Sequence, residues 1–152
     1  MYMKRLLFCL SIIIYHLSFS PAGALAQTGL HIDELFQGRV IPQEQMIETR
    51  VRGKTLEKYR LTYYRSLRFN ADEADCQRLR RMVDDDARGC FVMVYETNDS
   101  FTQKVQVAAR DGKNRFLCYQ EQRHKKKDLR EVTVIYMEGT VESLKQLEEL
   151  LK

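Results

Sequence analysis

Residues 70–96 read NADEADCQRLRRMVDDDARGCFVMVYE, and this stretch decides the fold class. In its first part, apolar residues recur every three or four positions, which predicts an amphipathic helix with the stripe Cys76, Leu79, Met82, Val83 and Ala87. Asn70 is the predicted N-cap, because Glu73 follows it at capping-box spacing, and Gly89 is the predicted end of the helix. Residues 90–96 are almost wholly apolar, aromatic or β-branched, which predicts a central strand.

The segments on either side of this stretch contain further strands and helices. Alternating polarity or short apolar runs predict strands at residues 46–51, 59–69, 101–109, 115–121 and 131–138. Asp111 and Gly112 form a hairpin-turn signal, and helical spacing predicts a short helix at 31–37 and a final helix capped by Thr140. Because the strands occur in runs, we predict a two-layer α+β fold. It has a mostly antiparallel sheet of about five to six strands, with two amphipathic helices packed on one face.

The first 26 residues are typical of a cleavable secretory signal peptide. Lys4 and Arg5 precede an apolar run over residues 6–19, and residues 24–26 read Ala-Leu-Ala, a small-residue cleavage site. The apolar run is shorter than the roughly 20 residues that a membrane-spanning helix needs. Cleavage after residue 26 would leave residues 27–44 as a lead-in segment and 45–152 as a single α+β domain, with no transmembrane anchor. The predicted location is therefore periplasmic, or outside the cell.

Charge and length limit the classes of function. The chain has 25 Lys and Arg residues against 21 Asp and Glu residues, a net charge of +4. Two of the basic residues belong to the predicted signal, so the mature net charge is +2. Such a balance, together with export, disfavours nucleic-acid binding. The predicted mature chain fits one domain whose core is large enough to need no metal or disulfide.

Two parts of the chain resemble a known type of protein. They are residues 48–53 (Glu-Thr-Arg-Val-Arg-Gly) with Leu56, Tyr59 and residues 61–69, and the closing strand, glycine and leucine-striped helix of residues 132–151. Both are similar to a family of short exported proteins of Bacteroidota whose function is unknown. The resemblance implies an envelope location in a Gram-negative bacterium and an α+β fold. It implies no catalytic residue.

The mature chain keeps an odd number of cysteines, namely Cys76, Cys90 and Cys118. At most one intramolecular disulfide can form, and the sequence leaves its pairing open. The alternative is that all three are small buried apolar residues. Their number and spacing do not suit a zinc site, and we predict no metal and no cofactor.

Two groups of residues are candidate binding sites. The strand predicted at 59–69 combines aromatic rings with guanidinium groups, a composition enriched in interaction surfaces, at Tyr63, Tyr64, Arg65 and Arg68. In the loop before the strand at 131–138, a basic run could contact anionic headgroups, phosphates or an acidic partner through Arg123, His124, Lys125, Lys126 and Lys127. The alternatives are core aromatics with solvated arginines for the first group, and a solvated turn for the second.

The sequence contains no recognisable arrangement of catalytic residues. The acidic triplet at 84–86 cannot converge on one cation from a regular helix, so we interpret it as a solvated, salt-bridged helix end. Cys–His pairs have no motif that would bring them together, and Glu48 with Glu96 is a carboxylate pair of a kind found in many sheet proteins. The leading hypothesis is a non-enzymatic exported module that binds a protein, a peptide or an anionic envelope component. The alternative is a hydrolase or transferase on cell-wall or glycan substrates.

Overall fold

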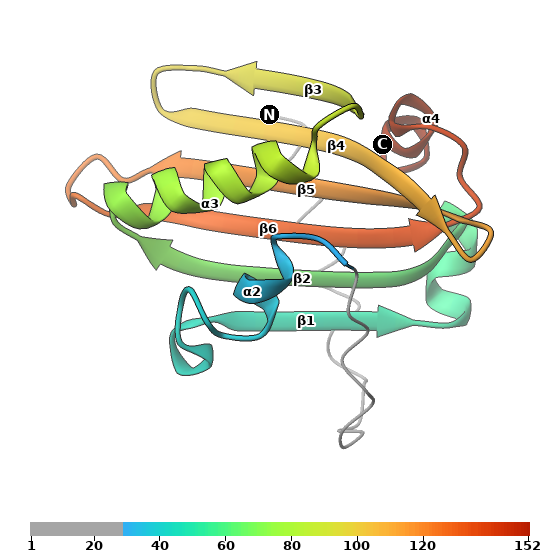
Figure 1. Cartoon of the computed structure of the whole chain (residues 1–152), viewed down its shortest axis with the longest axis horizontal. Helices are drawn as coiled ribbons and strands as arrows, with labels where there is room; N and C mark the ends of the chain where they lie inside the picture. The colour runs from blue at the N-terminus through green and yellow to red at the C-terminus, as the bar shows by residue number, and fades with distance from the viewer. Residues whose placement is uncertain (1–28) are drawn as a thin grey trace.

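The computed structural model describes residues 29–152, so the predicted signal peptide lies outside the described residues. The described part is a six-stranded antiparallel sheet with helices on it, in the order β1-β2-β6-β5-β4-β3 (Figure 1). The strands are β1 (Ile47–Arg52), β2 (Leu61–Ala71), β3 (Phe91–Glu96), β4 (Ser100–Arg110), β5 (Lys113–Arg123) and β6 (Arg130–Gly139). The helices are α2 (Asp33–Phe36), α3 (Glu73–Asp86) and α4 (Leu144–Leu150), with 3-10 helices at Gln43–Gln45 and η3 (Lys54–Tyr59). The predicted α+β fold is confirmed.

Local sequence explains the two tight hairpins. Between β4 and β5, Asp111 and Gly112 have φ angles of 52° and 73°. Positive φ at both central residues is what a two-residue hairpin turn requires, and Asp-Gly adopts it at little cost. Between β3 and β4, the backbone N–H of Thr97 donates to the Ser100 carbonyl at 2.8 Å, and the Thr97 hydroxyl accepts from the Ser100 N–H.

The start of α3 differs from the prediction by two residues. Asp72, not Asn70, is the N-cap, and its side chain accepts a hydrogen bond from the Asp75 N–H at 2.9 Å. The reason is that β2 continues to Ala71, which pairs with Arg130 of β6, so Asn70 is held in an extended strand. Similarly, α4 is capped by Ser143, not by Thr140, and the Ser143 hydroxyl accepts from the Gln146 N–H.

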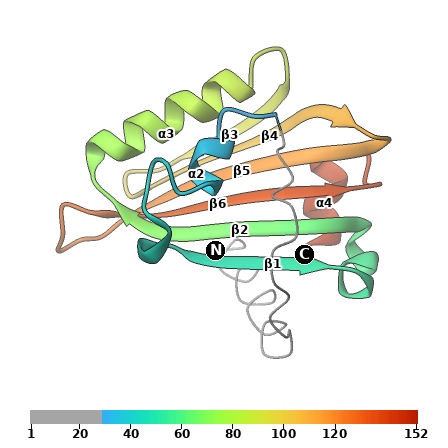
Figure 2. The same ribbon diagram turned by 60° about the horizontal axis from the view of Figure 1, so that its bottom comes forward.

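The helices lie on both faces of the sheet, not on one. On the α3 face, α2 and α3 cover a core cluster that includes Leu79, Leu117 and Tyr136. On the opposite α4 face, α4 and η3 cover a second cluster that includes Phe116 and Leu147 (Figure 2). The predicted arrangement is wrong because β5 and β6 have apolar residues at successive positions. Since neighbours on a strand point to opposite faces, both faces need a cover.

Strand β3 is an edge strand, whereas its composition predicted a central one. It pairs with β4 alone, and in Figure 1 no described element lies beyond it. Three of its large apolar side chains are well exposed: Phe91 at 61%, Val94 at 53% and Tyr95 at 48%. The structure therefore leaves part of a typical central-strand sequence uncovered. No helix among the described residues is long and apolar enough to cross a membrane.

Candidate functional site

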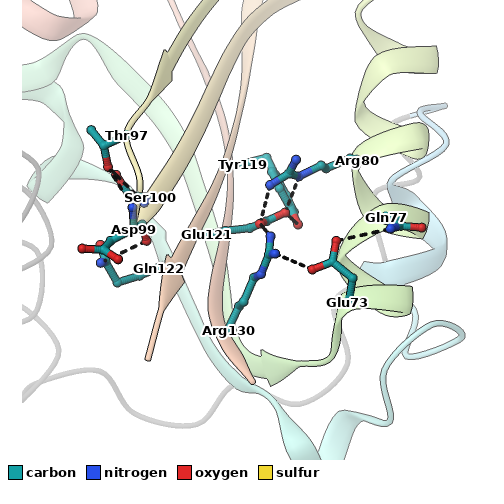
Figure 3. Close-up of polar contacts among 10 residues, drawn as sticks. All are labelled: Glu73, Gln77, Arg80, Thr97, Asp99, Ser100, Tyr119, Glu121, Gln122 and Arg130. Atoms are coloured by element: carbon teal, nitrogen blue, oxygen red, sulfur yellow. Dashed lines mark hydrogen bonds and ion pairs between the residues drawn. The ribbon is translucent and has the colours of Figure 1, made fainter. Parts of the chain in front are cut away.

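A buried carboxylate with two arginine partners is the most elaborate polar feature of the described chain (Figure 3). Glu121 on β5 is 2% exposed and accepts two hydrogen bonds from Arg80 of α3, each 2.6 Å long. It also accepts from the Tyr119 hydroxyl at 2.6 Å and from Arg130 of β6 at 2.7 Å. Arg130 forms a further ion pair with Glu73, in the first turn of α3. The cluster joins α3 to the two central strands.

The sequence produces this geometry through two periodicities. Residues 119 and 121 lie two apart on β5 and so share the α3 face of the sheet. Glu73, Gln77 and Arg80 recur at helical spacing and lie along one side of α3, where Gln77 donates to Glu73. The Arg80 guanidinium also lies 4.1 Å from the centre of the Phe101 ring, which contacts Tyr119 edge-to-face. The arginine is thus held on two sides.

The network keeps Glu121 ionised. Burial alone would raise the pKa of Glu121, but hydrogen bonds from Arg80, Tyr119 and Arg130 outweigh it and hold the pKa below the ordinary 4.5. Burial and the bond to this carboxylate raise the pKa of Tyr119. Each oxygen of Glu121 accepts two hydrogen bonds, so the group has no position left for a proton or a substrate. We interpret the cluster as a structural ion pair, not a general acid or base.

The stability of the fold should therefore depend on pH through Glu121. Because the pKa of Glu121 is lower in the fold than in the unfolded chain, its contribution is present above pH 4.5 and is lost as the pH falls through the lowered value. We expect Glu121→Gln to be less stable than the wild type at neutral pH, and the difference to shrink below pH 4.5. Urea unfolding of both proteins from pH 7 to pH 3 measures this. A difference that stays constant with pH would contradict the assignment of an ionised Glu121.

A shallow pocket of about 180 Å³ adjoins the network at the end of the sheet. Its charged lining residues are Arg80, Arg123 and Arg130 on the basic side and Glu73, Glu96, Asp99 and Glu121 on the acidic side. Three positive charges thus face four negative ones. The balance gives the pocket no net attraction for an anion, and Glu121 is already saturated. The described residues contain no group of three or more metal-ligating side chains that could hold an ion.

The basic run lies beside this pocket, in the connection between β5 and β6. Residues 123–127 are all exposed, and with Asp99 and Asp128 they line a second open hollow. Arg123 and three lysines supply four positive charges against two carboxylates, a net charge of +2 with His124 neutral. We call residues 123–128 the basic hairpin. Within the described chain, the structure shows no ion pair for Arg123 or for the three lysines.

Comparison with known proteins gives the family but no function. A family of unknown function, DUF6108, matches residues 19–151, which include every described helix and strand. The chain belongs to this family. No curated protein and no solved structure matches it. Membership of a family of unknown function agrees with the resemblance drawn from the sequence, whereas a Bacteroidota origin and export stay predictions.

In the DUF6108 domain, the four candidate residues of β2 are not brought together. Tyr63 packs edge-to-face on Tyr136 on the α3 face, whereas Tyr64 is buried in the cluster of the α4 face. Arg65 is 6% exposed and donates to Glu48 at 2.5 Å and to the Phe36 carbonyl at 3.0 Å. These side chains hold the core and the α2 segment in place.

Arg68 is the exposed member of this group and pairs with Glu131 at 2.7 Å. Strand alternation explains why a continuous aromatic and basic run does not become one surface. The candidates on β2 therefore do not form a common binding face.

The three cysteines of the DUF6108 domain are free thiols. Cys76 packs on the α3 face and Cys118 on the α4 face, so the sheet separates them. Cys90 follows α3, whereas Cys76 lies in its first turns, and the helix length between them exceeds the reach of a disulfide. Burial raises the pKa of the Cys76 and Cys118 thiols to about 11, which suits inert core residues and not nucleophiles.

The acidic residues at the end of α3 each have a separate partner. Asp84 accepts from Gln103 of β4, and Asp85 pairs with Arg88, as expected of a salt-bridged helix end. Asp86 differs from the prediction because it is buried. It accepts from the backbone N–H groups of His31 and Ile32 and lies 2.9 Å from the His31 ring nitrogen, so it fixes the start of α2.

The carboxylate pair considered for catalysis does not form, because Glu48 lies on β1 and Glu96 on β3, at opposite edges of the sheet. Sequence reasoning missed both buried acids, Asp86 and Glu121. For Glu121 a signal existed, because it has the same strand parity as the core residues Leu117 and Tyr119.

Proposed function

We propose that this protein is a non-enzymatic exported module that docks on an anionic surface of the cell envelope through the basic hairpin. One observation carries the proposal: Arg123, at the end of β5, and Lys125, Lys126 and Lys127, in the turn after it, are all exposed, and the described fold pairs none of them with a carboxylate. The signal-like segment at residues 1–26 supports an exported location.

The contrast with other basic residues strengthens the argument. Arg65, Arg80 and Arg130 each have carboxylate partners and connect elements of the fold. Their removal would disturb the structure. The basic hairpin joins two strands that already pair along ten positions from Asn114 to Arg123, so its charges are not needed for the register. Charges that the fold does not use are available to a ligand.

The chemistry of the hairpin favours phosphate groups. Lysines provide compact positive charges on flexible stems, which suit a surface of many phosphates better than one planar carboxylate. Each basic residue close to an anionic membrane contributes about 1 kcal/mol of binding energy. Phosphate-bearing lipid headgroups are therefore the ligand class that we propose. The alternative of a hydrolase or transferase has less support, because the buried carboxylate Glu121 is saturated by its own neighbours.

Sedimentation with lipid vesicles tests the proposal. The protein should bind vesicles that contain anionic phospholipid and not purely zwitterionic ones, and the binding should weaken as salt is added. Changing Lys125, Lys126 and Lys127 together to Gln removes about 3 kcal/mol, so the partition coefficient should fall on the order of a hundredfold.

A control variant loses the same number of positive charges as the triple hairpin variant, but at other positions. Changing Lys54, Lys145 and Lys152 to Gln removes three exposed lysines elsewhere, and its binding should stay within about threefold of the wild type. Equal losses in the two variants would show that only net charge matters, and would overturn the assignment to the hairpin. Release of the wild type by inorganic phosphate alone, at constant ionic strength, would point to a small soluble phosphate ligand instead of a membrane.

A further inference from the structure

The sequence of β3 is nearly palindromic. Residues 91–95 read Phe-Val-Met-Val-Tyr, so that aromatic, β-branched and central positions mirror each other about Met93. On a strand, Phe91, Met93 and Tyr95 share one face and Val92 and Val94 the other. An antiparallel partner with the same sequence would place each residue opposite one of its own kind.

The outer backbone groups of β3 are open. The Thr97 N–H bonds the Ser100 carbonyl, and β3 and β4 pair in a regular register from that turn to Phe91. Antiparallel pairs alternate between bonded and non-bonded, so residues 91, 93 and 95 exchange their hydrogen bonds with β4. The N–H and C=O groups of Val92 and Val94 therefore point away from β4. Figure 1 shows no described element on that side.

The other edge of the sheet is protected, and β3 is not. On β1, every second residue is charged, at Glu48, Arg50 and Arg52, and charged side chains discourage the addition of another strand. On β3 the last residue, Glu96, is the single charged one. Exposed apolar edges of this kind are what strand addition uses. The same sheet thus has one edge that resists pairing and one that invites it.

We propose that two copies of this chain pair β3 against β3, antiparallel, with the two-fold axis at Met93. Phe91 of each copy then lies opposite Tyr95 of the other, and Val92 opposite Val94. The two valine pairs exchange the outer backbone hydrogen bonds, and the aromatic pairs lie on the α4 face of the joined sheet, across the interface. The product is one continuous sheet across both copies.

This register avoids charge conflict. Glu96 lies opposite Cys90 of the second copy, so the two carboxylates are kept apart at the ends of the pairing. A two-fold interface repeats every contact, so each favourable pair counts twice. The pairing also makes β3 a central strand, which is the environment that its composition predicts. A strand of six residues gives a small interface, below about 1,200 Å² in total, so we expect a dissociation constant in the micromolar range.

Sedimentation equilibrium over a wide range of protein concentrations tests the dimer. The wild type should change from monomer to dimer, whereas Val94→Lys should raise the dissociation constant by more than about tenfold, because each interface gains two lysines. Val94 is 53% exposed, so the fold should tolerate the change. The control is Ile47→Lys, which makes the same kind of change on β1 at a residue that is 69% exposed, and it should leave the dimer intact.

A cysteine cross-link tests the register. In a Cys90→Ser background, Met93→Cys places two thiols on the two-fold axis at a non-bonded pair, where Cα atoms lie about 4.5 Å apart and a disulfide can form. Val94→Cys, one residue away, should link much less, because its own copy lies on a diagonal about 7–8 Å away. Mass spectrometry of the oxidised protein identifies the link.

Each other outcome overturns the proposal. A wild type that stays monomeric at all concentrations excludes self-pairing and leaves β3 for an extended peptide of a different protein. A dimer that Ile47→Lys abolishes, and Val94→Lys does not, places the interface on β1. A dimer with efficient linking through position 94 and none through position 93 has a two-fold axis at Val94, which contradicts the register centred on Met93.

Discussion

Replacing Glu121 with alanine is expected to lower the free energy of unfolding by about 3–5 kcal/mol. The reason is the loss of the acceptor, more than the loss of attraction. Arg80, Arg130 and the Tyr119 hydroxyl all donate to this one carboxylate. Without it, donors between α3 and the sheet would keep their desolvation cost and have no acceptor. Urea unfolding at pH 7, followed by circular dichroism, measures the change.

The same substitution on the neighbouring strand is the control. Glu131 pairs with Arg68 on the opposite face, and the two side chains are 31% and 55% exposed. A surface pair of this kind contributes about 0–1 kcal/mol, so Glu131→Ala should be nearly neutral. Similar losses from both substitutions would mean that the buried network has no special role.

The secondary structure was predictable because each element has one dominant local signal. The Asp111–Gly112 turn, the helix stripe before Gly89 and the alternating strands follow from local geometry, and they correspond to the observed elements. The first residues of α3 and α4 were harder to predict. Several residues near each start could cap a helix, and the extent of the preceding strand decides which one does.

The arrangement of the helices depended on information that a local pattern lacks. The apolar stripe of α4 shows that the helix covers a sheet, but not which face it covers. The signal lay in β5 and β6, where Phe116 and Leu117, or Ile135 and Tyr136, are apolar neighbours. Two successive apolar positions on a strand require cover on both faces.

The candidate site was predicted only in part. The basic run of the hairpin, residues 123–127, was visible because its five residues are consecutive and a loop needs no partner to expose them. The Glu121 network was not, because its members come from residues 73 to 130 and meet only after α3 packs on the sheet. The binding surface predicted on β2 was wrong for the opposite reason. Its residues are close in sequence, but consecutive residues on a strand point to opposite faces of the sheet.

Gly139→Ala is expected to lower the free energy of unfolding by about 4 kcal/mol, beyond the usual 1–3 kcal/mol for added volume in a packed site. A Cβ atom at Gly139 would lie 2.1 Å from the Arg60 carbonyl oxygen and 2.7 Å from the Leu61 Cα. Both contacts are with backbone, which cannot rotate away as a side chain can. Relief would require moving the chain where Thr140 donates to the Arg60 carbonyl at 2.9 Å and where β2 begins its pairing with β6.

A second glycine separates this collision from the ordinary effect of adding a methyl group. Gly112 has open space around it but a φ of 73°, so Gly112→Ala should cost only the left-handed conformation, about 1–2 kcal/mol. If Gly139→Ala cost no more than Gly112→Ala in urea unfolding, the close approach of residues 60, 61 and 139 would be wrong. If Gly139→Ala costs far more, then β6, η3 and the segment leading to α4 hold one another in place at the end of β6. The amide hydrogens of this region should then be among the last in the sheet to exchange.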